Sequence, residues 1–473
     1  MEGGNEQSGR GWWRSRWGRA AGVLVLAVLG VRLAWGWWVG RQLRACLEEV
    51  RRRGEPVEVG DVKYPRVPES ENAWELQQRA AQMVSASSPR SSNLEYRDYP
   101  PYEAVWMKMA EASERTNGAV FALMRQARGK SAVQFREKLT SPLANSLLPA
   151  LNNAKRLANT LADGVVYAHV RVDDAEALER LLDLLHLSRS LRQDDSMVSQ
   201  LVAIGIDALA CDATLIVGPG VRLDGAAMTR QKIREVIERL LEEEIEAKGL
   251  RRSVMIERLV MVEDGRGLSQ GTWFIRPVAD RQMIRASRNL DIVIEASGCK
   301  SWPEAQAVLR KCSTDKLRAG PEVPRYSRWF SSIQVDLSAY FERYFRMVAE
   351  RRAAAVVLAC QLYRADRRRW PERLEELVPE YLGAIPADPF RRDGQAVGYV
   401  VLKGKLPGGG DRPLVYFLPD YGAREDAPIP NEPITGWRVD LRVGGSRAPI
   451  RQYRDVARWG AGDMAKSGGQ GPK

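Results

Sequence analysis

One apolar stretch near the N-terminus constrains the fold of this chain more than any other feature. Residues 20–39 read AAGVLVLAVLGVRLAWGWWV. A helix of about twenty residues extends about 30 Å, which is the thickness of the hydrocarbon core of a bilayer. Arg32 interrupts the stretch toward one end, where a long side chain can reach the lipid headgroups. We therefore predict a transmembrane helix over residues 19–39.

The residues that flank this stretch support a spanning helix and predict its orientation. Tryptophans bracket it on both sides, as in the aromatic belts of membrane proteins: Trp12, Trp13, Trp17, Trp35, Trp37 and Trp38. Arginines precede it: Arg10, Arg14, Arg16 and Arg19. The positive-inside rule then predicts that residues 1–18 are cytoplasmic and that the bulk is extracytoplasmic, anchored in the inner membrane of a bacterium. The alternative is a cleaved signal peptide with its apolar core at 20–31, although no A-x-A cleavage site follows.

The charge balance bears on the partners of the chain. Its 473 residues carry a formal net charge of +12, which favours lipid headgroups, envelope polymers or nucleic acid. Four arginines before Trp370 form a potential phosphate-binding cluster: Arg364, Arg367, Arg368 and Arg369. A family resemblance carried by residues 363–390 implies that this cluster lies at an exposed helix end, where cations also suit the helix dipole. Because export removes most nucleic-acid partners, we expect the lipid bilayer and envelope proteins as partners, and no nucleic acid.

The middle of the chain is predicted to be helical. Residues 40–70 are expected to form a stalk, because Arg51-Arg52-Arg53-Gly54 and three prolines resist regular helix. Residues 71–335 show apolar spacings of three and four and are expected to form a helical domain. Within it we expect a polar loop at 86–102, a break at Asp194-Asp195 and a loop at 264–280.

Two features of this helical domain leave alternatives open. Gly164, Tyr167, Ala177 and Leu181 partly match a tetratricopeptide repeat, but no clean 34-residue period is present. The domain is therefore either a set of helical hairpins or a genuine repeat, and both architectures suit partner binding. The acids at 242–244 and Glu246 lie in a charged helix over 229–263, and we expect them on a solvated face.

A specific pattern follows a long helix predicted over residues 337–369. The helix contains AAAVVLACQLY at 353–363, which is expected to be a buried face. Residues 369–390 then read RWPERLEELVPEYLGAIPADPF. The pattern consists of Tyr363, Trp370, Pro371, Leu374, Leu377, Val378, Pro379, Tyr381, Leu382, Pro386, Asp388, Pro389 and Phe390. This region resembles the head domain of type II secretion major pseudopilins.

The resemblance implies a small antiparallel sheet packed on the long helix, in a module over 336–445 before a flexible tail at 446–473. Strand-like runs occur at Val397–Leu402, Pro413–Leu418 and Trp437–Val443. In the family, a loop between the last strands often holds calcium. Here Asp420 and Asp426 are the candidate ligands, against the alternative of a metal-free loop. Unlike pseudopilins, this chain has its anchor about 300 residues upstream and no prepilin-peptidase site before it.

No motif in the sequence predicts catalysis. His169 and His186 match no metal-site spacing, and Asp173-Asp174 and Asp194-Asp195 are interpreted as helix starts. Gly408-Gly409-Gly410 is interpreted as a turn rather than a phosphate-binding loop. The five cysteines behave as small hydrophobic residues, unless Cys299 and Cys312 pair after export.

These observations predict an α+β protein that is mainly α. It would have an N-terminal transmembrane helix, an extracytoplasmic helical domain and a small helix-plus-sheet module. We expect no enzymatic activity and no cofactor, and a binding or scaffolding role in envelope assembly or type II secretion-like machinery. The alternatives are an envelope hydrolase with carboxylate chemistry, marked by two acids with raised pKa values in one pocket, and a purely structural envelope protein.

Overall fold

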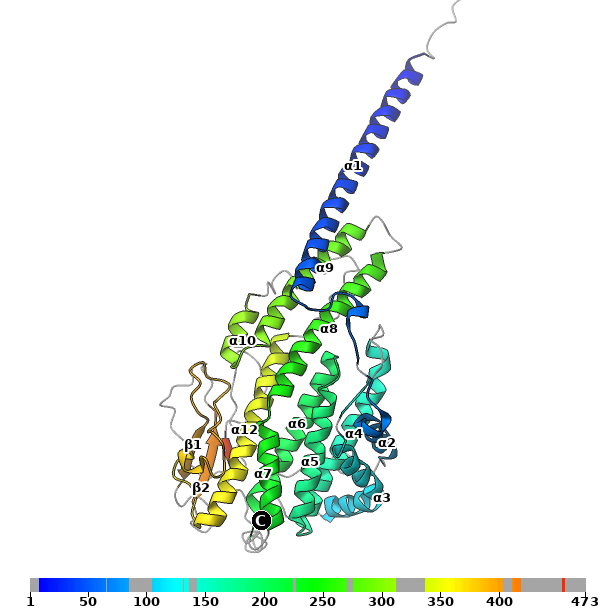
Figure 1. Ribbon diagram of the computed structural model, residues 1–473. Helices are drawn as coiled ribbons and strands as arrows, with labels where there is room; N and C mark the ends of the chain where they lie inside the picture. The colour runs from blue at the N-terminus through cyan, green and yellow to red at the C-terminus, as the bar shows by residue number, and fades with distance from the viewer. Residues whose placement is uncertain are drawn as a thin grey trace, which may run out of the picture. The chain divides into compact units, whose positions relative to one another are not determined.

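The computed structural model confirms that the chain is mainly helical with a small antiparallel sheet (Figure 1). It describes residues 8–64, 66–84, 104–130, 132–135, 143–223, 227–269, 275–311, 337–402, 411–417 and 453–455. These residues divide into two compact units. Unit 1 contains residues 1–63 and 255–291, and unit 2 contains residues 64–254 and 292–473.

Unit 1 is built on the long helix α1, Ser8–Arg52 (Figure 1). The helix contains the predicted membrane span and then continues through residues 40–52, which corrects the expectation of an irregular stalk from residue 40. It continues because Leu43, Leu47 and Val50 form a buried apolar stripe on one face. The helix ends just before Gly54, whose φ of 72° is a left-handed conformation that glycine adopts readily.

This stripe packs against the ends of two further helices, α8 (Glu244–Ser269) and α9 (Arg276–Ala296). The shared core consists of Val39, Leu43, Leu47, Val50, Val57, Val262, Met283 and Ile284. The loop expected at 264–280 is corrected where the structure describes it, since residues 264–269 belong to α8 and residues 276–280 belong to α9. Gly265 allows the close contact, since a Cβ there would lie 2.5 Å from the sulfur of Met283.

The first half of α1 has no such cover. Two helices are long and apolar enough to cross a membrane within the described ranges: Arg19–Arg52 and Met197–Gly220. The second is mostly buried inside unit 2, as a core helix is, whereas the apolar window of the first is fully exposed. The exposed large apolar side chains of α1 are Trp17, Val23, Leu24, Val25, Leu26, Val28, Leu29, Val31, Leu33, Trp37 and Trp38.

Unit 2 is a bundle of helices that pack mostly on their chain neighbours. Its helices are α2 (Ala73–Met83), α3 (Ala104–Arg128), α4 (Leu143–Val170), α5 (Asp174–Leu191), α6 (Met197–Val217), α7 (Ala227–Leu241), α10 (Trp302–Leu309) and α12 (Leu337–Arg367). Short 3₁₀ helices are η1 (Val59–Asp61), η2 (Glu69–Glu71), η4 (Gly218–Gly220) and η7 (Leu374–Leu377).

Several helix boundaries follow from local chemistry. The break predicted at residues 194–195 is confirmed, and α6 begins after Ser196, whose hydroxyl accepts from the amide of Val198. The charged helix expected over 229–263 is instead two helices, α7 and α8, which separate at Glu242 and Glu243. The loop predicted at 86–102 lies outside the described residues.

The C-terminal helix α12 is part of the bundle core. It packs on α6 and α7, and residues 353–363 are all buried, as their sequence predicted (Figure 1). The long helix predicted over 337–369 is confirmed. The sequence predicted a domain boundary at residue 335. The structure instead places α12 in the same compact unit as α2 to α7 and α10.

A small sheet lies against α12. Its strands are β1 (Gly398–Leu402), β2 (Arg412–Tyr416) and β3 (Tyr453–Asp455), paired antiparallel in the order β1-β2-β3. Two of the predicted strands are confirmed, and the third, Trp437–Val443, lies outside the described residues. The strand β3 falls in the segment 446–473 that was expected to be a flexible tail, so that expectation was wrong for residues 453–455. Gly398 is opposite Tyr416 and leaves room for its ring.

Candidate functional site

The segment that carries the pseudopilin-like pattern folds back along the end of α12. Arg368 has a φ of 58° and ends the helix, and η7 follows within a few residues. Most of the apolar pattern residues are buried: Tyr363, Pro371, Leu374, Leu377, Tyr381, Leu382, Pro389 and Phe390. Pro379 is exposed, and Trp370 and Pro386 are half-buried. The structure therefore brings the predicted motif residues together around one helix end.

Glu376, which the sequence analysis did not single out, organises this segment. Its carboxylate accepts hydrogen bonds from the Tyr363 hydroxyl, from Arg369 Nη2 at 2.7 Å and from the Glu372 amide at 2.7 Å. Burial alone would raise the pKa of Glu376, but these donors outweigh it and lower the pKa to about 2. The charge of Glu376 thus fastens η7 to α12.

The arginine cluster at this helix end is used for local contacts. The Arg364 guanidinium lies 4.4 Å from the centre of the Trp370 ring. Arg367 pairs with Glu380 at 3.2 Å, and Arg369 pairs with Glu376 at 2.7 Å. These partners are intramolecular, as expected of a cationic helix end rather than a phosphate-binding cluster.

Asp388 shapes the turn that leads into the sheet. Its buried carboxylate accepts from the Phe390 amide at 2.8 Å, and its own amide donates to the Gln395 carbonyl at 2.7 Å. The turn is also held by α10, because the Trp302 amide donates to the Pro389 carbonyl at 2.8 Å. The sheet is tied back to the motif, since the Tyr399 hydroxyl donates to the Pro371 carbonyl at 2.8 Å.

A cleft of about 380 Å³ lies between the outer face of α7 and the loop after η7. Its lining residues are Arg234, Ile237, Glu238, Leu241 and Glu242 on one wall and Pro379, Glu380, Tyr381, Leu382 and Gly383 on the other. The walls combine apolar side chains with both signs of charge. Pro379 and Gly383, which have small side chains, form part of the wall after η7. We refer to these residues as the α7 groove.

A buried ionic network fixes the α7 wall. Arg351 on α12 is 4 % exposed and donates from Nη1 to Glu246 at 2.8 Å and to Asp207 at 3.2 Å. Its other nitrogens donate to the carbonyls of Arg239 at 2.6 Å and Leu240 at 3.0 Å, at the end of α7. Arg192 binds Asp207 from the opposite side. The network therefore anchors the C-terminal turn of α7 to α12.

This network corrects one expectation from the sequence. Glu246 was expected on a solvated face but is 3 % exposed, and burial raises the pKa of its carboxyl. Its presence in the core is explained by the two arginines, Arg351 and Arg192, that face it. Nothing in the local pattern of acids distinguishes Glu246 from Glu244, which is exposed.

The two histidines are structural in different ways. His169 Nδ1 lies 2.6 Å from Asp174 Oδ1, and Arg222 binds the same carboxylate at 2.7 Å. The prediction that Asp173-Asp174 start a helix is confirmed, because Asp173 caps α5 and Asp174 is its first residue, with its side chain in this buried cluster. His186 is half-buried beside Arg128 and Arg189, and burial followed by these cations lowers its pKa to about 4.

The acid pair at 194–195 lies directly before the N-cap of a helix rather than at it. Asp194 accepts from the Ser199 hydroxyl and Asp195 from the Tyr64 hydroxyl, both at 2.5 Å. The N-cap of α6 is Ser196 instead. These aspartates therefore connect chain segments rather than cap one.

Several predicted positions lie outside the part of the chain that the structure describes. They are the calcium candidates Asp420 and Asp426, the turn at 408–410, and Cys312. The alternative that Cys312 pairs with Cys299 therefore stays a prediction. Cys46, Cys211, Cys299 and Cys360 are free thiols. Among the residues with described positions, no group of three or more His, Cys, Asp or Glu side chains is placed to hold a metal ion.

Comparisons with protein-family models, with curated proteins and with solved structures found no match. Function is therefore argued from the geometry of the chain itself.

Proposed function

We propose that this chain is a single-pass membrane protein with a cytoplasmic N-terminus, whose extracytoplasmic bulk binds a protein partner in envelope assembly or type II secretion-like machinery. One observation carries the proposal. The apolar window of α1 is fully exposed over a length that matches a bilayer core. An exposed apolar surface of this size is unfavourable in water and indicates a membrane or another apolar environment.

The way α1 joins unit 1 supports an anchoring role. Exposed apolar residues of the span give way at Val39 to the buried stripe that packs on α8 and α9. The span and its support are therefore one continuous helix without an intervening flexible stalk. Such a connection holds the folded unit close to the membrane surface.

The α7 groove supports the binding role. Its volume of about 380 Å³ is within the range of ligand-binding clefts, and its mixed lining suits a polypeptide segment with apolar and charged side chains. The loop that forms one wall carries Pro379, Tyr381 and Leu382 of the pseudopilin-like pattern.

The alternative of a hydrolase has less support. It would use two acids with raised pKa values that converge in one pocket. Burial raises the pKa of Asp183 and of Glu246, but each is packed among arginines within the bundle. Neither acid lines the α7 groove. A carboxylate held by arginines in this way stabilises helix packing.

Affinity purification from gently solubilised membranes tests the binding role. Deleting the C-terminal module would remove α12 from the core, so a surface variant of the groove is preferable. The charge reversal Arg234→Glu with Glu238→Lys changes two exposed groove residues on α7 and keeps the net charge. The matched control is Arg115→Glu with Glu111→Lys on the exposed face of α3.

We expect secretion or pilus-type components to co-purify with the native chain and the α3 control, and to be lost from the α7 variant. Equal recovery of such partners with all three chains would contradict docking at the groove. Recovery of no envelope protein with the native chain would contradict the binding role itself.

A further inference from the structure

The structure brings the α8–α9 hairpin to the point where the apolar span of α1 ends. Pro277 lies beside Gly36, where an added Cβ would be 3.3 Å from its ring, and Asp280 Oδ2 lies 4.0 Å from the corresponding position at Gly40. The start of α9 is therefore level with residues 36–40 of α1. At about 1.5 Å rise per residue, Arg41 and Arg44 follow Val39 by roughly 3 to 8 Å.

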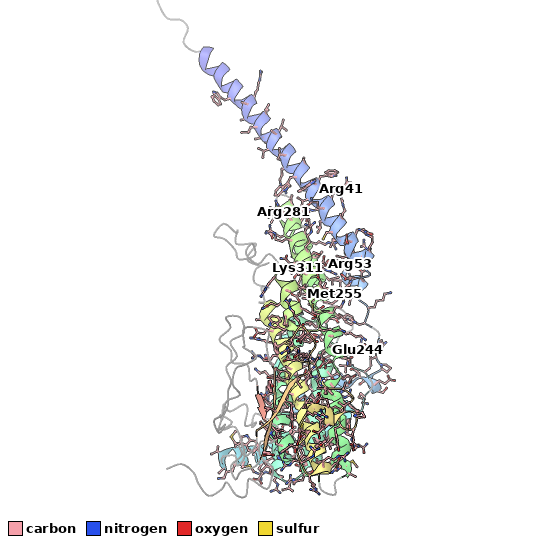
Figure 2. All side chains as sticks on the ribbon, turned by 90° about the vertical axis from the view of Figure 1, so that its left-hand side faces the viewer. Arg41, Arg53, Glu244, Met255, Arg281 and Lys311 are labelled. Carbon is pink, nitrogen blue, oxygen red and sulfur yellow. The ribbon has the colours of Figure 1, made fainter. Side chains whose placement is uncertain are left out.

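Arginines gather at this level from both helices. Trp37, Arg41 and Arg44 follow one face of α1 at helical spacing, and all three are exposed. Arg281 on α9 is exposed too, and Figure 2 shows it near Arg41 at the end of this unit from which the span extends. Arg276, on the first turn of α9, is 69 % exposed. We call Arg41, Arg44 and Arg281 the basic collar.

The collar arginines are not neutralised by acidic side chains among the described residues. No carboxylate of the described residues forms an ion pair with Arg41, Arg44 or Arg281. Glu48, the next acid along α1, pairs with Arg51 at 2.9 Å instead. Asp280 is buried against α1, and burial raises the pKa of its carboxyl. By contrast, Arg53 and Arg258, deeper in the same unit, both pair with Asp291.

We infer that the basic collar binds the phosphate groups of anionic phospholipids in the leaflet that α1 enters at its C-terminal end. The inference rests on the proposed membrane span. Arginine side chains a few ångströms beyond an apolar span lie at headgroup depth, and an aromatic side chain beside them favours the same interface. The Arg41 guanidinium already lies 5.7 Å from the centre of the Trp37 ring, which holds it near that level.

Lipid retention by the full-length protein tests this inference. The protein is reconstituted in nanodiscs that contain phosphatidylcholine and phosphatidylglycerol, then exchanged into mild detergent. The lipids that remain bound are identified by native mass spectrometry. The collar variant combines Arg41→Gln, Arg44→Gln and Arg281→Gln. The control combines Arg79→Gln, Arg115→Gln and Arg171→Gln, three exposed arginines of unit 2.

We expect the native chain and the control to retain phosphatidylglycerol above its bulk share, by about fivefold per contributing arginine, with a decrease at high salt. The collar variant should retain the bulk mixture. Enrichment that persists in the collar variant, or is absent from the native chain, would overturn the inference. A native chain that fails to insert in the nanodisc at all would overturn the membrane span as well, and an alkaline wash of the reconstituted sample distinguishes the two failures.

Discussion

Arg351 shows how single residues hold this bundle together. It is 4 % exposed and lies between two acids, Asp207 and Glu246, while it also binds the last carbonyls of α7. Burial disfavours a charged guanidinium, but the two carboxylates outweigh it and raise the pKa of Arg351. Each buried charge in this cluster is compensated by the opposite charges of its neighbours.

Replacement of Arg351 by methionine should strongly destabilise unit 2. The change roughly keeps the volume of the side chain but leaves Glu246 and three carbonyls without their hydrogen-bond donor, and leaves Asp207 with Arg192 alone. We expect a loss of about 3–5 kcal/mol in the free energy of unfolding. Urea denaturation checks this value. Lys248→Met is the control, because Lys248 and its partner Glu244 are exposed and should contribute nothing measurable.

His186 should make the stability of unit 2 depend on pH in a window where few other groups titrate. Its pKa is about 4 in the folded chain and about 6.5 when unfolded, so the unfolded state binds the proton more tightly. Stability is therefore complete above pH 6.5 and is lost as the pH falls toward 4. Between pH 7 and pH 5 the loss is up to about 2 kcal/mol.

The variant His186→Gln isolates this contribution. Thermal unfolding of the native chain should weaken between pH 7 and pH 5 by more than that of the variant. Identical pH profiles for the two chains would mean that His186 is solvated and that burial does not set its pKa.

At the scale of single residues, the sequence predicted which apolar residues are buried far better than it predicted which charged side chains contact one another. The apolar pattern around residues 370–390 placed Leu374, Leu377 and Tyr381 in one buried cluster, because fixed prolines and apolar spacing are local signals. Glu246 was missed because its partners, Arg351 and Arg192, lie on other helices. Glu376 was missed although Tyr363 and Arg369 are near in sequence, because they meet it only after the chain turns back at the end of α12. The arginine that stabilises a buried acid cannot be identified from the sequence, because the two residues meet only when the helices pack.

At the scale of elements, the close contact between α8 and α9 depends on Gly265. Gly265 on α8 faces Met283 of α9, which is fully buried, and a Cβ there would meet the sulfur at 2.5 Å. Gly267, one half-turn later, has nothing within 4 Å. Gly265→Val should therefore separate α8 from α9 and cost about 1–3 kcal/mol as an overpacked contact.

Gly267→Val serves as the control for the same side chain on the same helix. It should leave stability unchanged or raise it slightly, because valine restricts the unfolded chain more than glycine does. Hydrogen exchange of the α8 and α9 amides distinguishes the two variants. Equal protection in both would contradict close packing at Gly265.

The apolar half of α1 should respond to charge only when a membrane is present. Leu26 is 69 % exposed near the middle of the predicted span. Leu26→Arg should cost about 2.5–3.5 kcal/mol in insertion, because a charge would lie in the hydrocarbon core. Thermal unfolding of the same variant in detergent should be unchanged. Membrane flotation measures insertion, and normal flotation of the variant would contradict burial of Leu26 in lipid.

Elements were predicted well where one physical signal dominated. The 3.6-residue periodicity identified α12, and the β-rich runs identified β1 and β2. The signals failed at element ends. Residues 40–52, 264–269 and 276–280 were expected to be irregular because of glycine, proline and charge, yet they are helical. In residues 40–52 the buried stripe of Leu43, Leu47 and Val50 explains the difference. Tertiary packing outweighed local propensity there.

At the scale of the whole molecule, the chain is organised as two compact units that its sequence order does not reveal. Unit 1 combines the N-terminus with residues 255–291, more than 200 positions away. No composition change marks these boundaries, because both fall inside helices. The helix α8 begins in unit 2 and ends in unit 1, and α9 begins in unit 1 and ends in unit 2. The sequence could therefore predict a mainly helical protein with a long apolar N-terminal helix, but not the α8–α9 hairpin that packs on that helix.

Protease accessibility tests most directly whether α1 spans the membrane with the chain after residue 39 outside the cytoplasm. The native chain is expressed in bacteria, and a protease is added to spheroplasts or to inside-out membrane vesicles. The account predicts that the bulk of the chain is digested in spheroplasts and protected in inside-out vesicles. Protection in spheroplasts with digestion in the vesicles, or recovery of the intact chain in the soluble fraction, would contradict it.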